Sequence, residues 1–332
     1  MILLVPAGAF AADIITEYPL PKEKAYATGV SVGPDGYVWF LLYIDNLLAR
    51  FDPDTRELEV FNIPTSKSGS IDTAIDGEGI IWFSQEDSNA LGRFDPKSKK
   101  FKEYFLPTIQ TKPDSIFASK DGMIWILGWN NDLLVKFNPK SEKFSEYKIP
   151  SEKSNSYDLS EDHHGHLWFI ERAANKLAMF DPQKETFKEY PVAPQFQSPL
   201  GTVVDSKGHV WYIRMIDNTL VGFDPETEKS KVFNMPKNKG TKEIAIDKKD
   251  NIWLVQHTDG RLIRFRQSSG IFQTFNIPTT KAKPISLAID PEGSVWFTEV
   301  VKAKLGFLDI NVAGEIAKKL KVKINAPKNL FK

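Results

Sequence analysis

One tryptophan recurs through this 332-residue chain at an almost constant interval. Successive copies lie 43, 43, 43, 43, 42 and 43 residues apart, and the series comprises Trp39, Trp82, Trp125, Trp168, Trp211, Trp253 and Trp296. Only Trp129 falls outside it. An internal period of about 40 to 45 residues is typical of propellers, in which each repeat is one blade. The repeat therefore indicates one large domain rather than two unrelated ones.

Three further sequence positions repeat with the same period as the tryptophan. Glycine stands three residues before it in six copies, in D-x-x-G-like turns, and the sixth copy has Asp250 instead. Phenylalanine follows eleven or twelve residues later, and a third aromatic position leads into I-P or L-P endings such as Ile63-Pro64. The short β-branched and aromatic runs between these positions predict four strands per repeat. We therefore expect an all-β, seven-bladed β-propeller with four antiparallel strands per blade.

The third aromatic position appears at Tyr18, before the first tryptophan, and has no counterpart after Phe307. The strand around Tyr18, residues 14–20, is therefore predicted to complete the last blade and to close the ring. This places a single propeller domain at residues 12–309. Residues 310–332 form a basic extension, for which a solvated tail is the simplest interpretation.

The N-terminus has a signal-like pattern. Residues 2–10 are apolar, and Ala9-Phe10-Ala11 has the small-x-small form of a signal-peptidase site, so residues 1–11 are interpreted as the remnant of a signal peptide. This predicts a secreted, periplasmic or otherwise extracytoplasmic protein. No Lys or Arg precedes the run, so an ordinary apolar N-terminus is the alternative.

Composition excludes several function classes. Lys plus Arg and Asp plus Glu both number 43, so no basic field favours nucleic acid. No apolar run is long enough for a transmembrane helix. The chain has no cysteine, which excludes disulfides and thiolate metal sites. We expect a monomer.

The recurring stretches Glu17-Tyr18-Pro19-Leu20-Pro21, Asp35-Gly36-Tyr37-Val38-Trp39-Phe40 and Lys176-Leu177-Ala178-Met179-Phe180 resemble the virginiamycin B lyase (streptogramin lyase) propellers. The resemblance spans about residues 14 to 309 and implies a carbon–oxygen lyase that opens a streptogramin ring with a histidine base and Mg²⁺ held by glutamates.

The resemblance also shows where this chain departs from the family. The histidine positions carry Ile285 and Lys242, a glutamate position carries Lys283, and the first-copy tyrosine position carries Thr28. The metal glutamate falls at or beside Val300, one residue after Glu299. We therefore expect a non-catalytic protein and assign no catalytic residue and no cofactor, with Mg²⁺ implied only by the resemblance.

Strand geometry identifies a candidate binding site at one mouth of the channel. The residues eleven before and three after each tryptophan are expected to meet there, because the first strand of a blade starts where the second ends. The ligand-binding candidates are Gln85, Asp114, Trp129, Tyr157, Asp158, Glu171, Arg214, Lys242, Glu243, Gln256 and Glu299. Such a mixed set of charges would hold a small polar or zwitterionic ligand, or a protein partner. A solvated rim of ion pairs is the alternative.

Two metal hypotheses and one catalytic alternative remain. Glu171 and Glu299 are weak candidates for Mg²⁺ or Ca²⁺, and the run from Glu161 to His166 could bind Zn²⁺ or form an ordinary surface turn. The alternative to a binding protein is a lyase or another metal-assisted enzyme with a relocated base, for which Glu171, Glu299 and Tyr157 are the candidates.

Overall fold

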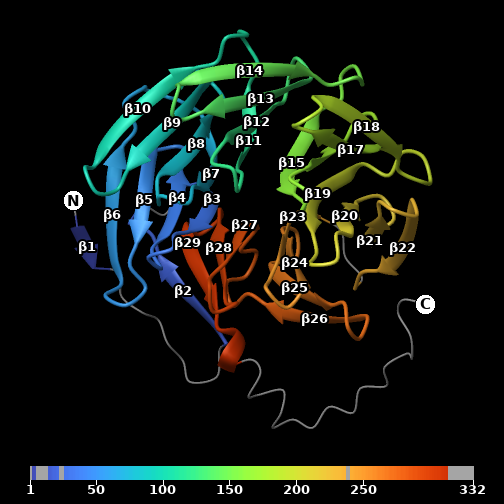
Figure 1. The fold of residues 1–332 in the computed structure, drawn as a ribbon. Coiled ribbons are helices and arrows are strands. Elements are labelled where there is room, and N and C mark those ends of the chain that lie inside the picture. The colour runs from blue at the N-terminus through green and yellow to red at the C-terminus, as the bar shows by residue number, and fades with distance from the viewer. Residues whose placement is uncertain (1, 5–13, 22–25, 237–239, 313–332) are drawn as a thin grey trace.

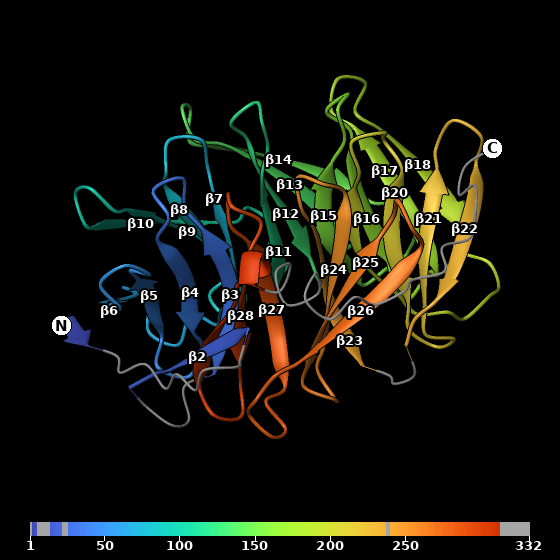
Figure 2. The same cartoon turned by 90° about the horizontal axis from the view of Figure 1, so that it is seen from below.

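The computed structural model describes residues 2–4, 14–21, 26–236 and 240–312. Seven four-stranded antiparallel blades stand in a ring, one of them extended by a fifth short strand, which confirms the seven-bladed β-propeller (Figure 1). The first strand of each blade lies next to the channel and contacts the first strands of both neighbouring blades. Figure 2 shows the same ring from its side, after a turn of 90°. No helix of the described residues is long and apolar enough to cross a membrane.

The strands of the first four blades follow the repeat. Blade 1 contains β3 (Ala27–Val32), β4 (Val38–Leu42), β5 (Leu47–Phe51) and β6 (Glu57–Asn62), and blade 2 contains β7 (Ser70–Ile75), β8 (Ile81–Gln85), β9 (Ala90–Asp95) and β10 (Lys100–Phe105). Blade 3 contains β11 (Pro113–Ala118), β12 (Ile124–Gly128), β13 (Leu133–Asn138) and β14 (Lys143–Lys148), and blade 4 contains β15 (Ser156–Glu161), β16 (Leu167–Glu171), β17 (Lys176–Asp181) and β18 (Thr186–Pro191).

The remaining blades complete the ring. Blade 5 contains β19 (Pro199–Val204), β20 (Val210–Arg214), β21 (Thr219–Asp224) and β22 (Lys229–Asn234), and blade 6 contains β23 (Thr241–Ile246), β24 (Asn251–Gln256), β25 (Arg261–Arg266) and β26 (Ile271–Asn276). Blade 7 takes β27 (Pro284–Ile289), β28 (Val295–Glu299) and β29 (Lys304–Leu308) from the C-terminal part and β2 (Ile15–Pro19) from the N-terminal part.

The N-terminal strand closes the ring as predicted. β2 pairs with β29, with Tyr18 opposite Leu305. The short strand β1 (Ile2–Leu4) was not expected, and it pairs with β6 at the outer edge of blade 1. Residues 5–13, including the predicted cleavage site after Ala11, lie outside the described residues, as do residues 313–332 of the basic extension. The prediction of export stays a prediction.

The repeated tryptophan joins a turn to the core. In blade 2, Asp76 Oδ1 accepts hydrogen bonds from turn backbone amides, and its Oδ2 accepts one of 2.8 Å from Trp82 Nε1. Gly79 completes this turn with φ +80°, a conformation that favours glycine. The same aspartate-to-indole bond recurs at Trp168, Trp211 and Trp253. The D-x-x-G-x-x-W pattern is therefore one unit in which the turn orients the indole.

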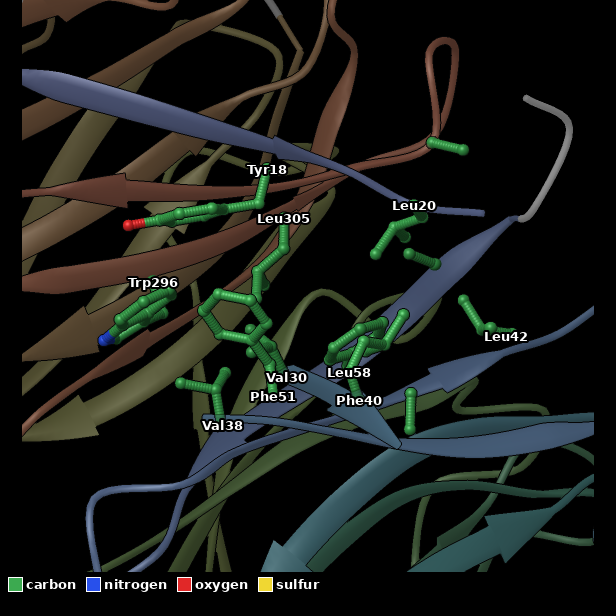
Figure 3. Packing of buried hydrophobic residues seen from close by; sticks show 13 residues of the cluster. Tyr18, Leu20, Val30, Val38, Phe40, Leu42, Phe51, Leu58, Trp296 and Leu305 are labelled. Carbon is green, nitrogen blue, oxygen red and sulfur yellow. The ribbon is translucent and has the colours of Figure 1, made fainter. Parts of the chain in front are cut away.

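Aromatic side chains fill the space between blades. At the closure, Tyr18 packs 4.7 Å from the ring of Phe51 and 6.1 Å from that of Trp296, with Leu305 beside them (Figure 3). Trp296 of blade 7 thus packs against Phe51 of blade 1, as Trp39 of blade 1 packs against blade 2. Each blade covers a face that its neighbour cannot bury alone, which is why the repeat specifies a closed ring.

Candidate functional site

A β-bulge near the start of each inner strand turns side chains toward the channel. In blade 3 the pairing of β11 with β12 shifts register between Pro113 and Ser115, so Asp114 has no partner across the strand. Equivalent shifts leave Asp158 and Lys242 unpaired. A bulge re-aims the side chain of its extra residue. All three residues line the same cavity.

The cavity occupies the mouth of the channel that lies far from the D-x-x-G turns, and its volume is about 440 Å³. It brings together five of the candidates from the sequence: Asp114, Tyr157, Asp158, Lys242 and Glu243. It also contains Asp72, which was not among the candidates from the sequence. Counting back from Trp82 selects Ile71 instead, and only the bulge between Ser70 and Thr73 brings the next residue into the cavity.

Three of the four carboxyl groups join neighbouring blades. Asp72 Oδ2 accepts a hydrogen bond of 3.0 Å from the backbone N–H of Ile116 in the next blade. Asp158 Oδ2 accepts one of 3.2 Å from Thr202. Glu243 bonds in the same way to blade 7, at the backbone N–H of Leu287. These carboxyl groups replace sheet hydrogen bonds that the inner strands of separate blades cannot form, so they have a structural role.

Asp114 and Tyr157 differ from these three. Neither side chain has a hydrogen-bond partner among the described residues, although both line the cavity and both are only partly exposed. A buried or half-buried polar group without a partner is unfavourable in the protein and is therefore available to a ligand. These two side chains are the part of the cavity with unused hydrogen-bonding capacity.

The carboxyl groups perturb one another. Burial, with a smaller contribution from repulsion by a neighbouring aspartate, raises the pKa of Asp72, Asp114 and Asp158 to about 7 in each case. Burial, together with repulsion from two aspartates, raises the pKa of Glu243 well above its ordinary value. The Tyr157 phenol stays protonated, because burial and then the charge of Asp114 raise its pKa well above 10. The cavity therefore holds weakly acidic groups that ionise near neutral pH.

The residues three after each tryptophan do not lie in this cavity, contrary to the expectation from the sequence. The side chains of Gln85, Glu171, Gln256 and Glu299 are fully buried and do not line it. Glu171 lies directly opposite Ser156 rather than Tyr157, and Glu299 lies opposite Pro284. The bulge shifts the register, and strand side chains alternate between faces, so the two rows of residues point in different directions.

The buried side chains three residues after the tryptophans face groups within their own blades. Gln85 Nε2 donates a 2.6 Å hydrogen bond to Glu103. Glu171 lies against Glu189 on the outermost strand of its blade and Glu299 against Glu17, and each pair can form a hydrogen bond only when one of its two carboxyl groups is protonated. These groups stabilise blades and are not accessible to a ligand.

Arg214 also belongs to the blade interior. It is 7% exposed, its Nε donates a 2.9 Å hydrogen bond to Thr219, and it forms an ion pair with Asp217. Trp129 lies in the loop after β12, at the same end of the blade as the cavity, but it does not line the cavity. Neither residue contributes to the cavity walls.

The histidine-rich turn lies at the other end of blade 4, between β15 and β16. His166 is oriented by Asp162, which accepts from its ring at 3.0 Å and also accepts from Trp168 Nε1. The rings of His163 and His164 lie 4.0 Å apart. Asp162 is thus engaged by the turn and the indole, as its counterparts in other blades are.

The residues at the mouth do not fit a magnesium ion. The resemblance assigns the metal to the neighbourhood of Glu299, whose carboxyl group is buried against Glu17 and does not reach the cavity. Within the described part of the chain, no group of three or more His, Asp or Glu side chains is arranged to hold a metal ion.

Comparison with known proteins extends the resemblance. The model of the virginiamycin B lyase family matches residues 9–180 and 185–328. The chain belongs to the virginiamycin B lyase family. No curated relative matches it.

Several solved structures have the same fold. A streptogramin B lyase structure superposes with a TM-score of 0.82 at 24% identity, covering 89% of this chain and 97% of that one. A catalytically inactive virginiamycin B lyase from Staphylococcus aureus, solved with quinupristin, gives a TM-score of 0.82 at 21% identity. The match covers 88% of this chain and 98% of that one. A structure described as YCF48 bound to D1 peptide gives a TM-score of 0.71 at 13% identity. The match covers 91% of this chain and 99% of that one. In this virginiamycin B lyase family member, Thr28, Lys242 and Ile285 all line the channel cavity.

Proposed function

We propose that this family member binds a small organic amine at the mouth of its channel and does not open a streptogramin ring. The observation that carries the proposal is the gathering of four carboxyl groups in one cavity, with Asp114 lacking a hydrogen-bond partner among the described residues. A volume of about 440 Å³ lies within the range typical of small-molecule sites.

The charge of the cavity supports a cationic ligand. Asp72, Asp114, Asp158 and Glu243 outnumber Lys242, the one lysine in the lining. Burial is the main cause of the raised carboxyl pKa values, and repulsion between neighbouring carboxylates adds to it. An ammonium group would relieve that repulsion and donate charge-assisted hydrogen bonds to Asp114.

The positions at which the family resemblance expects the base histidines carry no histidine in this cavity. The family resemblance places histidines at positions occupied here by Ile285 and Lys242, and an isoleucine cannot accept a proton. Of the relocated bases considered from the sequence, Glu171 and Glu299 are buried away from the cavity. Tyr157 does reach the cavity, but its raised pKa keeps the phenol protonated.

Calorimetric titration with putrescine tests the proposal. We expect binding that weakens at least about tenfold in Asp114→Asn, because a hydrogen bond to a charged group contributes about 1.5 to 3 kcal/mol. Succinate, a dianion of similar length, should not bind. Asp54→Asn is the matched control, because Asp54 lies in an exposed turn after β5. Equal binding of succinate, or no effect of Asp114→Asn, would exclude the proposal.

A second experiment addresses the lyase activity directly. Incubation of the purified protein with a streptogramin B substrate and Mg²⁺ should leave the ring closed, because loss of a general base typically lowers the rate by about 10² to 10⁴. Mass spectrometry distinguishes the linear product from the ring by its fragmentation. Turnover that scales with protein concentration would favour the lyase alternative instead.

A further inference from the structure

Exposed apolar side chains gather at one end of the propeller. Ten large hydrophobic residues of the described chain are exposed, and eight of them lie in or beside loops at the end where the inner strands begin: Tyr26, Tyr43, Ile44, Phe105, Ile109, Phe196, Ile216 and Val301. The exceptions are Val232, in the middle of β22, and Val312. This is the end that contains the acidic cavity.

The strand pairing fixes this assignment. Phe105 pairs with Ala90 at the start of β9, and the second strand of each blade ends opposite the start of the first, as Gly128 does with Pro113. The loops that follow the second and fourth strands therefore share one end of the ring. The D-x-x-G turns occupy the opposite end and contribute none of the eight residues.

The exposure of the largest members is far beyond what packing requires. Phe196 is 83% exposed, Ile109 is 77% exposed and Phe105 is 65% exposed. Phe196 and Ile216 come from loops joined by a backbone hydrogen bond from Ile216 to Gln197. The backbone carbonyl of Ile109 accepts a hydrogen bond from the side-chain amide of Asn131, which fixes the loop at this residue. Single exposed apolar residues are ordinary, but a set concentrated on one end marks an interaction surface.

We propose that this end of the propeller, the apolar rim together with the acidic cavity, docks a protein segment that inserts a lysine or arginine side chain into the channel mouth. The inference rests on the proposed amine site and identifies the amine as part of a protein. The cavity carboxyl groups complement a basic side chain, and the rim matches apolar residues on either side of it.

A protein surface fits this end better than a lipid bilayer does. The apolar residues stand in separate loops around a polar cavity rather than forming one continuous face. Carboxyl groups at the centre of such a ring would be repelled by anionic lipids, whereas they pair readily with a buried cationic side chain of a partner.

Defined peptides test the inference. The probe is Gly-Leu-Tyr-Lys-Tyr-Leu-Gly, compared by calorimetry with Gly-Ser-Ser-Lys-Ser-Ser-Gly and with the first peptide carrying Glu in place of Lys. We expect the apolar lysine peptide to bind at least about tenfold more tightly than the serine peptide, since burial of apolar side chains contributes about 25 cal/mol per Å². The glutamate peptide should not bind.

Variants separate the rim from the cavity. Phe196→Ser with Ile109→Ser should reduce the affinity for the apolar peptide to that for the serine peptide and leave putrescine binding unchanged. Both side chains are exposed, so the fold should be retained. Val232→Ser is the matched control, because it removes an exposed apolar side chain from the middle of a strand.

The outcomes distinguish this inference from the function on which it rests. If putrescine binds but apolar flanks bring no advantage, only the docking inference is wrong. If neither putrescine nor any lysine peptide binds, the amine site itself is wrong. The protein could also sediment with phosphatidylcholine vesicles. If Phe196→Ser abolishes that sedimentation and Asp114→Asn leaves it intact, the surface binds lipid, and the inference is overturned.

Discussion

The side-chain amide of Gln85 donates a 2.6 Å hydrogen bond to Glu103, and in blade 7 Glu299 occupies the same position against Glu17. An ionised Glu299 would offer no donor, and both its oxygens would lack partners. Burial and the hydrogen bond with Glu17 raise the pKa of Glu299 to about 9, so it is protonated at neutral pH. Protonated Glu299 is therefore equivalent to the amide of Gln85.

This equivalence predicts that Glu299→Gln removes a pH-dependent loss of stability. The folded-state pKa of Glu299 is above its unfolded value, so its contribution is complete below about pH 4.5 and is lost as pH rises toward 9. Urea denaturation should show wild type and variant equal near pH 4.5. At pH 9 the variant should be more stable by a few kcal/mol, since one pKa unit corresponds to about 1.4 kcal/mol.

Two further substitutions control this experiment. Glu299→Ala should destabilise the protein by about 1 to 3 kcal/mol near pH 4.5, because it leaves buried groups without a partner. Gln85→Glu should introduce the pH dependence into blade 2. A difference between wild type and Glu299→Gln that does not change with pH would show that Glu299 is not protonated in the folded protein.

The ring closure predicts a large effect at Tyr18. Its ring is 7% exposed and packs between Phe51 and Trp296 at the seam between blades 7 and 1. Tyr18→Ala should lower the free energy of unfolding by about 3 to 5 kcal/mol, as for other large aromatic truncations in a core. Deletion of residues 1–20 should cost at least as much, because it removes β2 from β29.

Deletion of residues 1–12 is the matched control for the closure. It removes β1, a strand of three residues at the outer edge of blade 1, and leaves β2 in place. Thermal denaturation should therefore detect a small change at most. Equal melting of the two truncations would contradict the role of β2 in closing the ring.

The cavity predicts that amine binding strengthens as pH rises. Asp114 has a pKa of about 7, raised by burial and then by Asp72, and an ammonium group prefers its ionised form. Putrescine affinity should therefore increase about tenfold or more between pH 5.5 and 8.5, with proton release in calorimetry. In Asp114→Asn the increase should become smaller. An affinity that falls over this range would contradict the assignment.

Arg214 tests the division between cavity and blade interior. Its position three residues after Trp211 predicted a place at the ligand site, where its removal would leave stability unchanged. In the structure it is buried and donates to Thr219 and to the carbonyl oxygen of Ala193. Arg214→Ala should therefore lower the free energy of unfolding by about 2 to 3 kcal/mol and leave putrescine affinity unchanged, as urea denaturation and calorimetry can check.

Much of this architecture was predictable from the sequence, because it arises from local and repeated interactions. The turn and the buried indole lie within seven consecutive residues, and the turn aspartate bonds to the tryptophan six residues later, as Asp76 does to Trp82. The spacing of these residues therefore reveals the turn and the buried indole together. Tyr18 precedes the first repeated tryptophan, and the last repeat lacks the corresponding aromatic residue. This difference predicted the pairing of β2 with β29.

The candidate site was only partly predictable, because it depends on an irregularity that spacing does not show. The inner-strand bulges bring Asp72 and Asp158 into the cavity and leave Glu171 and Glu299 buried within their blades. One extra residue in a strand reverses which face each later side chain occupies. The periodic sequence by itself determined the number of blades, their order and the closure. Only the tertiary structure decided which of the charged candidates face the channel and that Asp72 joins them, because that choice depends on the register between strands.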